Sequence, residues 1–187
     1  MRWDAVHDSR TTFLACMRAL CSPGTPIELS GTPQICEHPE LDRGAAVLLA
    51  LLDRGLGLGT HGGDAVHRVA DMVCALTGAD SAEVGAADWV LVHGPAATPI
   101  SQARRGTRRT PETGATVVIA TAGEARPLLL SGPGLPEPTT AFVPLDALAL
   151  HALSAANADP PAGVDLLIVT PECLIGLPRS VAIQAVP

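Results

Sequence analysis

The segment LLDRGLGLGTHGGDAV, residues 51–66, is decisive for the fold because it contains the spacing G-x-G-x-x-G from Gly57 to Gly62. In dinucleotide-binding folds this spacing follows a hydrophobic strand and opens a helix, so that backbone N–H groups meet a pyrophosphate. Because 18 of the 187 residues are glycine, a chance match is expected, and the context of the motif decides its meaning.

The residues around the motif predict the order helix, short strand, helix. Residues 45–52 are apolar on nearly every side, which indicates a buried helix that Asp42 caps. The alternating run LGLGT then predicts a short strand containing Gly57 and Gly59, and residues 64–77 predict a second helix. Because these two glycines fall inside the strand rather than after it, the order disfavours a dinucleotide-binding loop.

The remainder of the chain alternates helices with strands early and forms hairpins late. Residues 9–22 predict a helix with large apolar residues on one face, namely Phe13, Leu14, Met17 and Leu20. Further strands are predicted in DWVLVHG, ATVVIATAGEARPLLLSGPG, VDLLIVTPECLIGLP and SVAIQAV, and a helix in LDALALHALSAAN. Residues 95–114 read as a long polar loop. This order predicts an α/β fold, a single three-layer αβα domain with a mixed sheet over residues 1–187.

Composition narrows the range of partners and compartments. The net charge of −7 makes general binding of nucleic acid unexpected. The start, MRWDAVHDSR, has no apolar signal core, and the apolar run over 44–52 is too short to cross a bilayer. We therefore expect a cytoplasmic protein without a membrane partner.

Cysteine and lysine usage bear on cofactors. The five cysteines form no C-x-x-C pair, and a zinc site would have to combine Cys36 with His38, His61 or His67. We expect buried thiols and no metal. All twelve basic side chains are arginine, so no lysine amine exists to form a Schiff base with pyridoxal phosphate, and we expect no cofactor.

Four stretches, taken in order, resemble one family. They are FLACMRALCSPG, GTRRTPETGAT, LLLSGPGLPE and the C-terminal PAGVDLLIV with LPRS. Together they are similar to PhnH, a subunit of the bacterial carbon–phosphorus lyase system for phosphonate degradation. The resemblance extends from about residue 8 to residue 186.

The resemblance implies a fold similar to that of pyridoxal-phosphate-dependent transferases, a homodimer, and a core complex with PhnG, PhnI and PhnJ. It also implies a function. PhnH is required with PhnG, PhnI and PhnL to form α-D-ribose 1-methylphosphonate 5-triphosphate from ATP and methylphosphonate. Because the nucleosidase activity is attributed to PhnI in this system, the resemblance implies that this chain is a supporting subunit that is inactive alone.

Four arginines of the loop RRGTRR stand close together, and arginine forks suit phosphate oxygens: Arg104, Arg105, Arg108 and Arg109. Arg105 and Arg108 are therefore candidate ligands for the triphosphate. The alternative is a solvated or partner-facing loop, which the sequence favours because the family has no such dense cluster here.

Two further residues are candidates near this loop. Glu112 could bind a ribose hydroxyl or act as a base, or it could shape the turn by accepting backbone N–H bonds. Arg179 could line a substrate cleft, or pair with Asp165 as a structural bridge across the last hairpin, and the structural alternative is favoured for both residues.

Three functions stay open on the sequence. The chain is a supporting subunit of a phosphonate-activating complex, or it supplies substrate-binding or catalytic residues to that step, or it is an independent nucleotide-binding enzyme. The third is disfavoured by the missing strand before Gly57.

Overall fold

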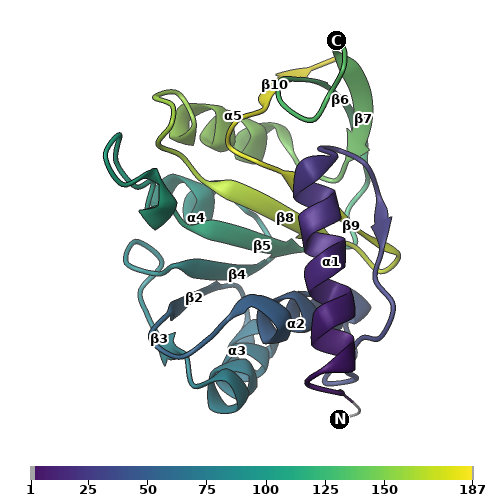
Figure 1. The fold of residues 1–187 in the computed structure, drawn as a ribbon, viewed down its shortest axis with the longest axis vertical. Helices are drawn as coiled ribbons and strands as arrows, with labels where there is room; N and C mark the ends of the chain where they lie inside the picture. Colours follow the sequence, from purple (N-terminus) through teal and green to yellow (C-terminus); the bar gives the residue numbers. More distant parts are fainter. Residues whose placement is uncertain (1–2, 187) are drawn as a thin grey trace.

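The computed structural model describes residues 3–186, in which helices cover both faces of a central sheet (Figure 1). The helices are α1 (His7–Cys21), α2 (Pro39–Leu51), α3 (Asp64–Thr77), α4 (Ala97–Gln102), the 3-10 helix η1 (Pro111–Thr113) and α5 (Ala147–Ala156). The strands are β1 (Ile27–Glu28), β2 (Gly57–His61), β3 (Asp80–Ser81), β4 (Trp89–His93), β5 (Thr116–Ala120), β6 (Arg126–Ser131), β7 (Thr139–Val143), β8 (Asp165–Val169), β9 (Cys173–Leu177) and β10 (Ala182–Ala185).

The central sheet has seven strands in the order β1-β9-β8-β5-β4-β2-β3. Strands β3, β2, β4, β5 and β8 are parallel; β9 pairs antiparallel with β8, and β1 pairs antiparallel with β9. A second sheet of three antiparallel strands has the order β10-β6-β7. The predicted mixed sheet is thus confirmed, and so is the predicted β8–β9 hairpin.

Alternating side chains of the central strands build two cores, one on each face. On β5, Val118 packs with helices α1, α2 and α3, whereas its neighbours Val117 and Ile119 pack with α4, α5 and the small sheet. The architecture is therefore three-layered, as predicted, with three helices on one face and two helices and a small sheet on the other.

Several local predictions need correction. The loop over 95–114 contains α4, and the strands β3 and β7 were not predicted. The two strands predicted around Gly123 belong to different sheets, because β6 pairs with β7 and β10 instead of β5. Asp42 does not cap α2, since the helix already begins at Pro39, a residue suited to a first helical position.

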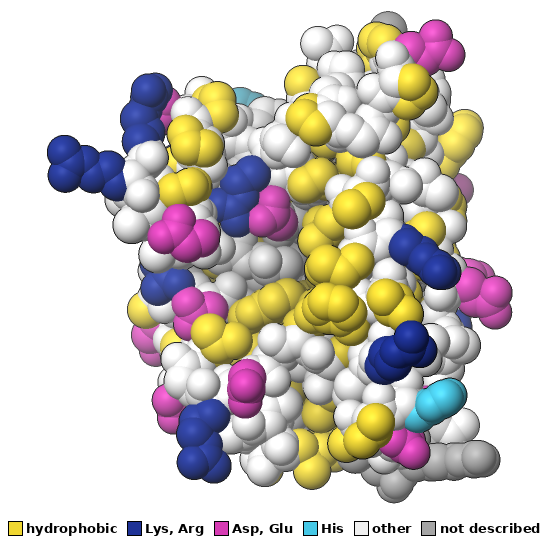
Figure 2. Space-filling view, in the orientation of Figure 1, with side chains coloured by type: hydrophobic (Ala, Val, Ile, Leu, Met, Phe, Trp, Pro, Cys, Tyr) yellow, Lys and Arg dark blue, Asp and Glu magenta, His cyan; other side chains and the backbone are white. Residues whose placement is uncertain are grey.

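The first helix buries its small residues and exposes its large ones. Ala15, Cys16 and Ala19 are buried, whereas Phe13 is 43% and Leu14 39% exposed. The reason is close approach: a Cβ at Gly176 of β9 would clash with the backbone of Ala19. Phe13 and Leu14 of the predicted apolar face are therefore turned outward, whereas Met17 and Leu20 are partly buried, and Figure 2 shows apolar side chains gathered along α1.

Within residues 3–186, no helix combines the length and the apolar character that crossing a bilayer requires.

The parallel strands give the sheet two functionally different edges. We call the edge where they begin the amino edge and the edge where they end the carboxyl edge. The carboxyl edge carries the last residues of β2, β4, β5 and β8, which are His61, His93, Ala120 and Val169.

The topology reverses between the neighbouring strands β2 and β4. Helix α3 follows β2 and packs in one core, whereas α4 follows β4 and packs in the other. In open α/β sheets a crevice opens where two neighbouring strands send their connections to opposite faces, at the carboxyl ends of those strands. The ends of β2 and β4 are such a position.

Candidate functional site

The site residues predicted from the sequence all lie at the amino edge. Arg179 follows β9, which is antiparallel to β8, and it therefore reaches the start of β8 at Asp165. The loop over 104–114 lies beside the starts of β4 and β5. On the left of Figure 2, arginine and acidic side chains gather together.

The Arg179 side chain is largely buried and its donors are matched. Its Nε donates to Asp165 Oδ2 at 3.0 Å, and its Nη1 donates to the Pro111 carbonyl at 2.7 Å. Its backbone N–H also donates to Asp165 Oδ1 at 2.7 Å. The structural pair considered for Asp165 and Arg179 is present, and it also fastens the 3-10 turn at Pro111 to the sheet.

Arg104 holds the other end of the loop. It forms an ion pair with Asp88, and its Nε donates to the Thr113 carbonyl at 2.6 Å. Asp88 in turn accepts the backbone N–H of Gly57 at 2.8 Å. One arginine therefore joins the loop, the start of β4 and the start of β2.

The two predicted phosphate ligands have partners of their own. Arg108 pairs with Asp159, both exposed, and the arginine lowers the pKa of the Asp159 carboxyl by a side-chain hydrogen bond and by its charge. Arg105 Nη1 donates to the Ala155 carbonyl at 3.4 Å. Among the described residues, the Arg109 side chain forms no ion pair.

Glu112 is exposed in the first turn of η1. It lines a shallow hollow with Arg179, Pro160 and Ser180, whereas Arg105 and Arg108 are absent from this lining. The structure thus brings Glu112 and Arg179 to one surface and leaves the two loop arginines outside it. The substrate-binding and catalytic roles of these residues stay predictions.

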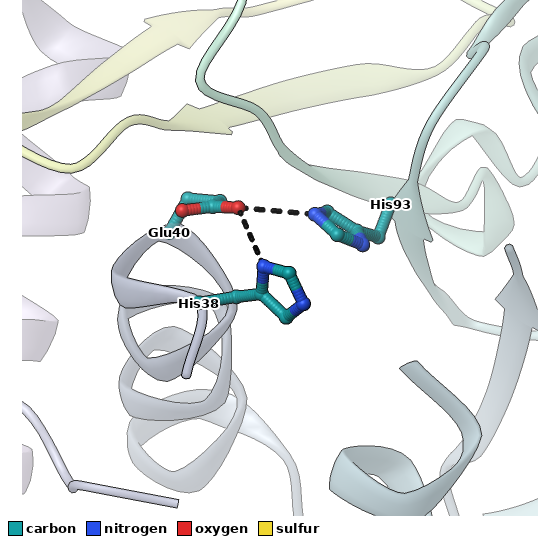
Figure 3. Close-up of side chains that lie close together, drawn as sticks. All are labelled: His38, Glu40 and His93. Atoms are coloured by element: carbon teal, nitrogen blue, oxygen red, sulfur yellow. Dashed lines mark hydrogen bonds and ion pairs between the residues drawn. The ribbon is translucent and has the colours of Figure 1, made fainter. Parts of the chain in front are cut away.

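A different group of side chains meets at the carboxyl edge: His38, Glu40 and His93 (Figure 3). His38 is the residue before α2, Glu40 lies in the first turn of α2, and His93 is the last residue of β4. The three side chains point toward one another from the helix and the strand.

The carboxylate of Glu40 is the centre of this group. Its Oε1 lies 3.0 Å from His93 Nε2 and 3.6 Å from His38 Nδ1, and one ligand atom from each residue lies within 4.8 Å of the others. The Glu40 side chain is only 7% exposed, against 25% for His93 and 46% for His38. The group is therefore closed on the carboxylate side and open to solvent on the His38 side.

Asp42 fixes the segment that precedes α2, which carries His38, by accepting hydrogen bonds from its backbone. Its Oδ1 accepts the backbone N–H groups of Ile35 at 2.9 Å and Cys36 at 3.1 Å. The Cys36 thiol lies 3.6 Å from the same oxygen, and burial, followed by the charge of Asp42, raises its pKa. Cys36 is thus kept as a neutral thiol beside the group.

Gly62 fixes the position of His93 from the neighbouring strand. Its φ is +145°, and a Cβ there would lie 2.5 Å from the His93 carbonyl oxygen. A glycine is needed because only a residue without Cβ allows this approach and this φ. The third glycine of the G-x-G-x-x-G spacing therefore packs against the end of β4.

The other two glycines of the spacing also have a packing role. Gly57 and Gly59 lie inside β2, as predicted, and a Cβ on Gly59 would be 3.1 Å from Val84 Cα and Ala87 Cβ. The glycines allow the connection from β3 to β4 to lie against the strand.

The sequence identified only part of this second group. It singled out His38, but grouped it with Cys36, His61 or His67. His67 instead lies 3.0 Å from the Thr60 hydroxyl, and Glu40 and His93 join His38. One feature of the sequence could have identified His93: it is a polar residue at the end of a buried strand. In a parallel sheet, such a residue lies at the edge where ligands bind.

Residues 2–184 match the family model described as bacterial phosphonate metabolism protein (PhnH). The match covers nearly the whole chain and confirms the resemblance found on the four sequence stretches. No curated protein matches the chain.

Proposed function

The chain belongs to the PhnH family and therefore acts in phosphonate metabolism, and on this premise we propose that it is a supporting subunit of a carbon–phosphorus lyase core complex. In this role it is needed with PhnG, PhnI and PhnL to form α-D-ribose 1-methylphosphonate 5-triphosphate from ATP and methylphosphonate. The family match over residues 2–184 carries the proposal.

The amino edge supports a structural role. Arg104, Arg108 and Arg179 each pair with an aspartate. Arg104 and Arg179 also donate hydrogen bonds to backbone carbonyls. Because a triphosphate needs arginine donors that are free to turn toward it, these three paired arginines are better suited to holding the loop than to binding an anion.

The outer face of α1 supports assembly. Phe13 and Leu14 are exposed beside the partly buried Met17 and Leu20, so an apolar strip follows the helix. We propose that such a strip is covered in a homodimer or by PhnG, PhnI or PhnJ, because exposed apolar patches on soluble proteins mark interaction sites.

A second function, direct participation in the same step, is favoured by one observation. Glu112 and Arg179 line one hollow, which places a carboxylate beside a guanidinium at the surface. Under this alternative Glu112 binds the ribose or acts as a base, and Arg179 contacts the phosphonate or triphosphate.

The two functions are separated by comparing assembly with turnover in the reconstituted complex with ATP and methylphosphonate. If the chain is a supporting subunit, Arg105→Ala with Arg108→Ala, and separately Glu112→Gln, assemble normally and turn over at wild-type rates. A tenfold or greater loss of ATP use with intact assembly would instead assign the residues a direct role, since a charge-assisted hydrogen bond contributes about 1.5–3 kcal/mol.

The family resemblance implies a fold similar to that of pyridoxal-phosphate-dependent transferases, yet the chain contains no lysine. We propose that the chain keeps such a fold without the cofactor, because no lysine is present to form the internal aldimine. The purified protein incubated with pyridoxal phosphate should show no imine absorption and no borohydride-trapped adduct. A stoichiometric side-chain adduct contradicts this.

A further inference from the structure

The buried carboxylate of Glu40 lacks a permanent positive partner. Among the described residues, its ion-pair neighbours are the imidazoles of His38 and His93, and Arg43, three residues along α2, does not pair with it. Removing a carboxylate from water is costly unless a cation compensates it. An imidazole is not a permanent cation, whereas a metal ion between the three side chains would compensate the carboxylate at every pH at which it stays bound.

The distances suit a metal ion. Two zinc ligands at bonds of about 2.0–2.1 Å in tetrahedral geometry are separated by about 3.3 Å. The two separations from Glu40 Oε1, 3.0 Å and 3.6 Å, lie on either side of that value. Binding requires the His38 ring, whose side chain is 46% exposed, to turn and bring its nitrogen closer to that of His93.

The position in the fold also suits a ligand. His93 ends β4 where the topology reverses next to β2, at the edge where open α/β sheets bind ligands. Two histidines with one carboxylate are a common donor set for transition metals that keep an open coordination position. The exposed side of His38 leaves room for water in that position.

We propose that His38, Glu40 and His93 bind one divalent transition metal ion of the zinc type, with a fourth position open to water. The site departs from the sequence prediction of no metal, and it is independent of the function proposed above. It uses no cysteine: among the described residues, the ligand atoms that lie within 4.8 Å of one another come from His38, Glu40 and His93.

Untagged full-length protein tests the site, since a histidine tag would itself bind metal. The exposed Cys21 is replaced by serine in every sample, and bound metal is removed with a chelator. Zn²⁺ is then titrated by calorimetry, and Co²⁺ is added as a spectroscopic probe. We expect one ion per chain and visible d–d bands of a nitrogen and oxygen site, without a thiolate charge-transfer band.

Two variants and one control decide the ligands. His93→Asn and His38→Asn should each weaken binding at least about 100-fold, because even changes outside the ligand sphere cost about 10–100-fold. His61→Asn, at the end of the neighbouring strand, should bind as the parent does. His38 is half exposed, so its variant keeps the fold, which circular dichroism of the metal-free protein verifies.

Three results overturn the proposal. They are binding of well under one ion per chain in the parent, binding that survives both histidine variants, and a thiolate band that accounts for the bound Co²⁺. In each case the group is a carboxylate hydrogen-bonded to His93 with the His38 imidazole nearby, without a metal.

Discussion

The charged side chains at the two edges of the seven-stranded sheet have different kinds of partners. At the amino edge, Arg179 and Arg104 each have an aspartate and a backbone carbonyl as partners. At the carboxyl edge, the buried carboxylate of Glu40 has, among the described residues, only two imidazoles as ion-pair neighbours.

This difference separates structural charges from a binding site. A charge whose partners come from the same chain fastens that chain, and removing it destabilises the fold. A buried carboxylate that a bound cation would compensate is instead a candidate for ligand binding. We therefore propose that the charges of the amino edge stabilise the fold and that the carboxyl edge carries the metal site.

The largest effect is expected from Arg179→Ala. The change leaves Asp165 largely buried without its partner and removes the donor to the Pro111 carbonyl, so the free energy of unfolding should fall by about 2–4 kcal/mol. Urea denaturation measures it. Arg109→Ala, in the neighbouring loop, is the control and should stay within about 0.5 kcal/mol of the parent. Equal stability of both variants would remove the structural assignment of the amino edge.

Gly62→Ala tests the carboxyl edge. A Cβ 2.5 Å from the His93 carbonyl oxygen, at a φ of +145°, must displace the end of β4, which should cost about 1–3 kcal/mol of stability. The same displacement should weaken Zn²⁺ binding. Gly63→Ala is a matched control, because nothing lies within 4 Å of its Cβ position. If both variants behave as the parent in denaturation and in metal titration, Gly62 does not position His93.

A smaller effect is expected from Arg104→Ala. Its pair with Asp88 is about one-third exposed, so water and salt screen it, and the loss should be about 0.5–1 kcal/mol. Denaturation at low and high salt measures this, and the difference between parent and variant should shrink at high salt. A loss that does not depend on salt would assign the effect to the hydrogen bond from Arg104 to the Thr113 carbonyl.

The smallest effect is expected from Arg108→Ala. Because Arg108 lowers the pKa of the Asp159 carboxyl, the pair contributes to stability above the ordinary pKa of aspartate, and the contribution is lost as pH falls through the lowered value. Both groups are exposed, so no measurable change in unfolding is expected at neutral pH. The pKa of Asp159, followed by nuclear magnetic resonance, should rise in the variant. An unchanged titration would show that the two side chains do not pair in solution.

Local patterns in the sequence predicted much of the fold. The β8–β9 hairpin and helix α5 follow from apolar alternation and from Asp146, whose side chain accepts the Ala149 N–H at 2.7 Å. The pairing of β6 with β10 joins segments about 50 residues apart, so no local pattern revealed it, whereas the β6–β7 hairpin was missed because strand β7 was not predicted. Likewise, the outward face of α1 depends on Gly176, far away in the chain.

The groups of side chains at the two edges also differ in how well the sequence predicted them. The amino-edge arginines stand in one short loop, so their grouping was visible, although their partners Asp88 and Asp159 were not. Glu40 and His93 are separated by 53 positions and meet because the first turn of α2 lies beside the end of β4. The spacing of residues within a short motif cannot predict a contact between residues so far apart in the chain.

Anomalous scattering at the zinc absorption edge, from crystals of the untagged protein grown with Zn²⁺, tests the contrast between the two edges most directly. The account predicts one strong peak between His38 Nδ1, Glu40 Oε1 and His93 Nε2, and no peak at the amino edge. A map with no peak between these three residues, or with zinc bound only at the cysteines, would contradict it.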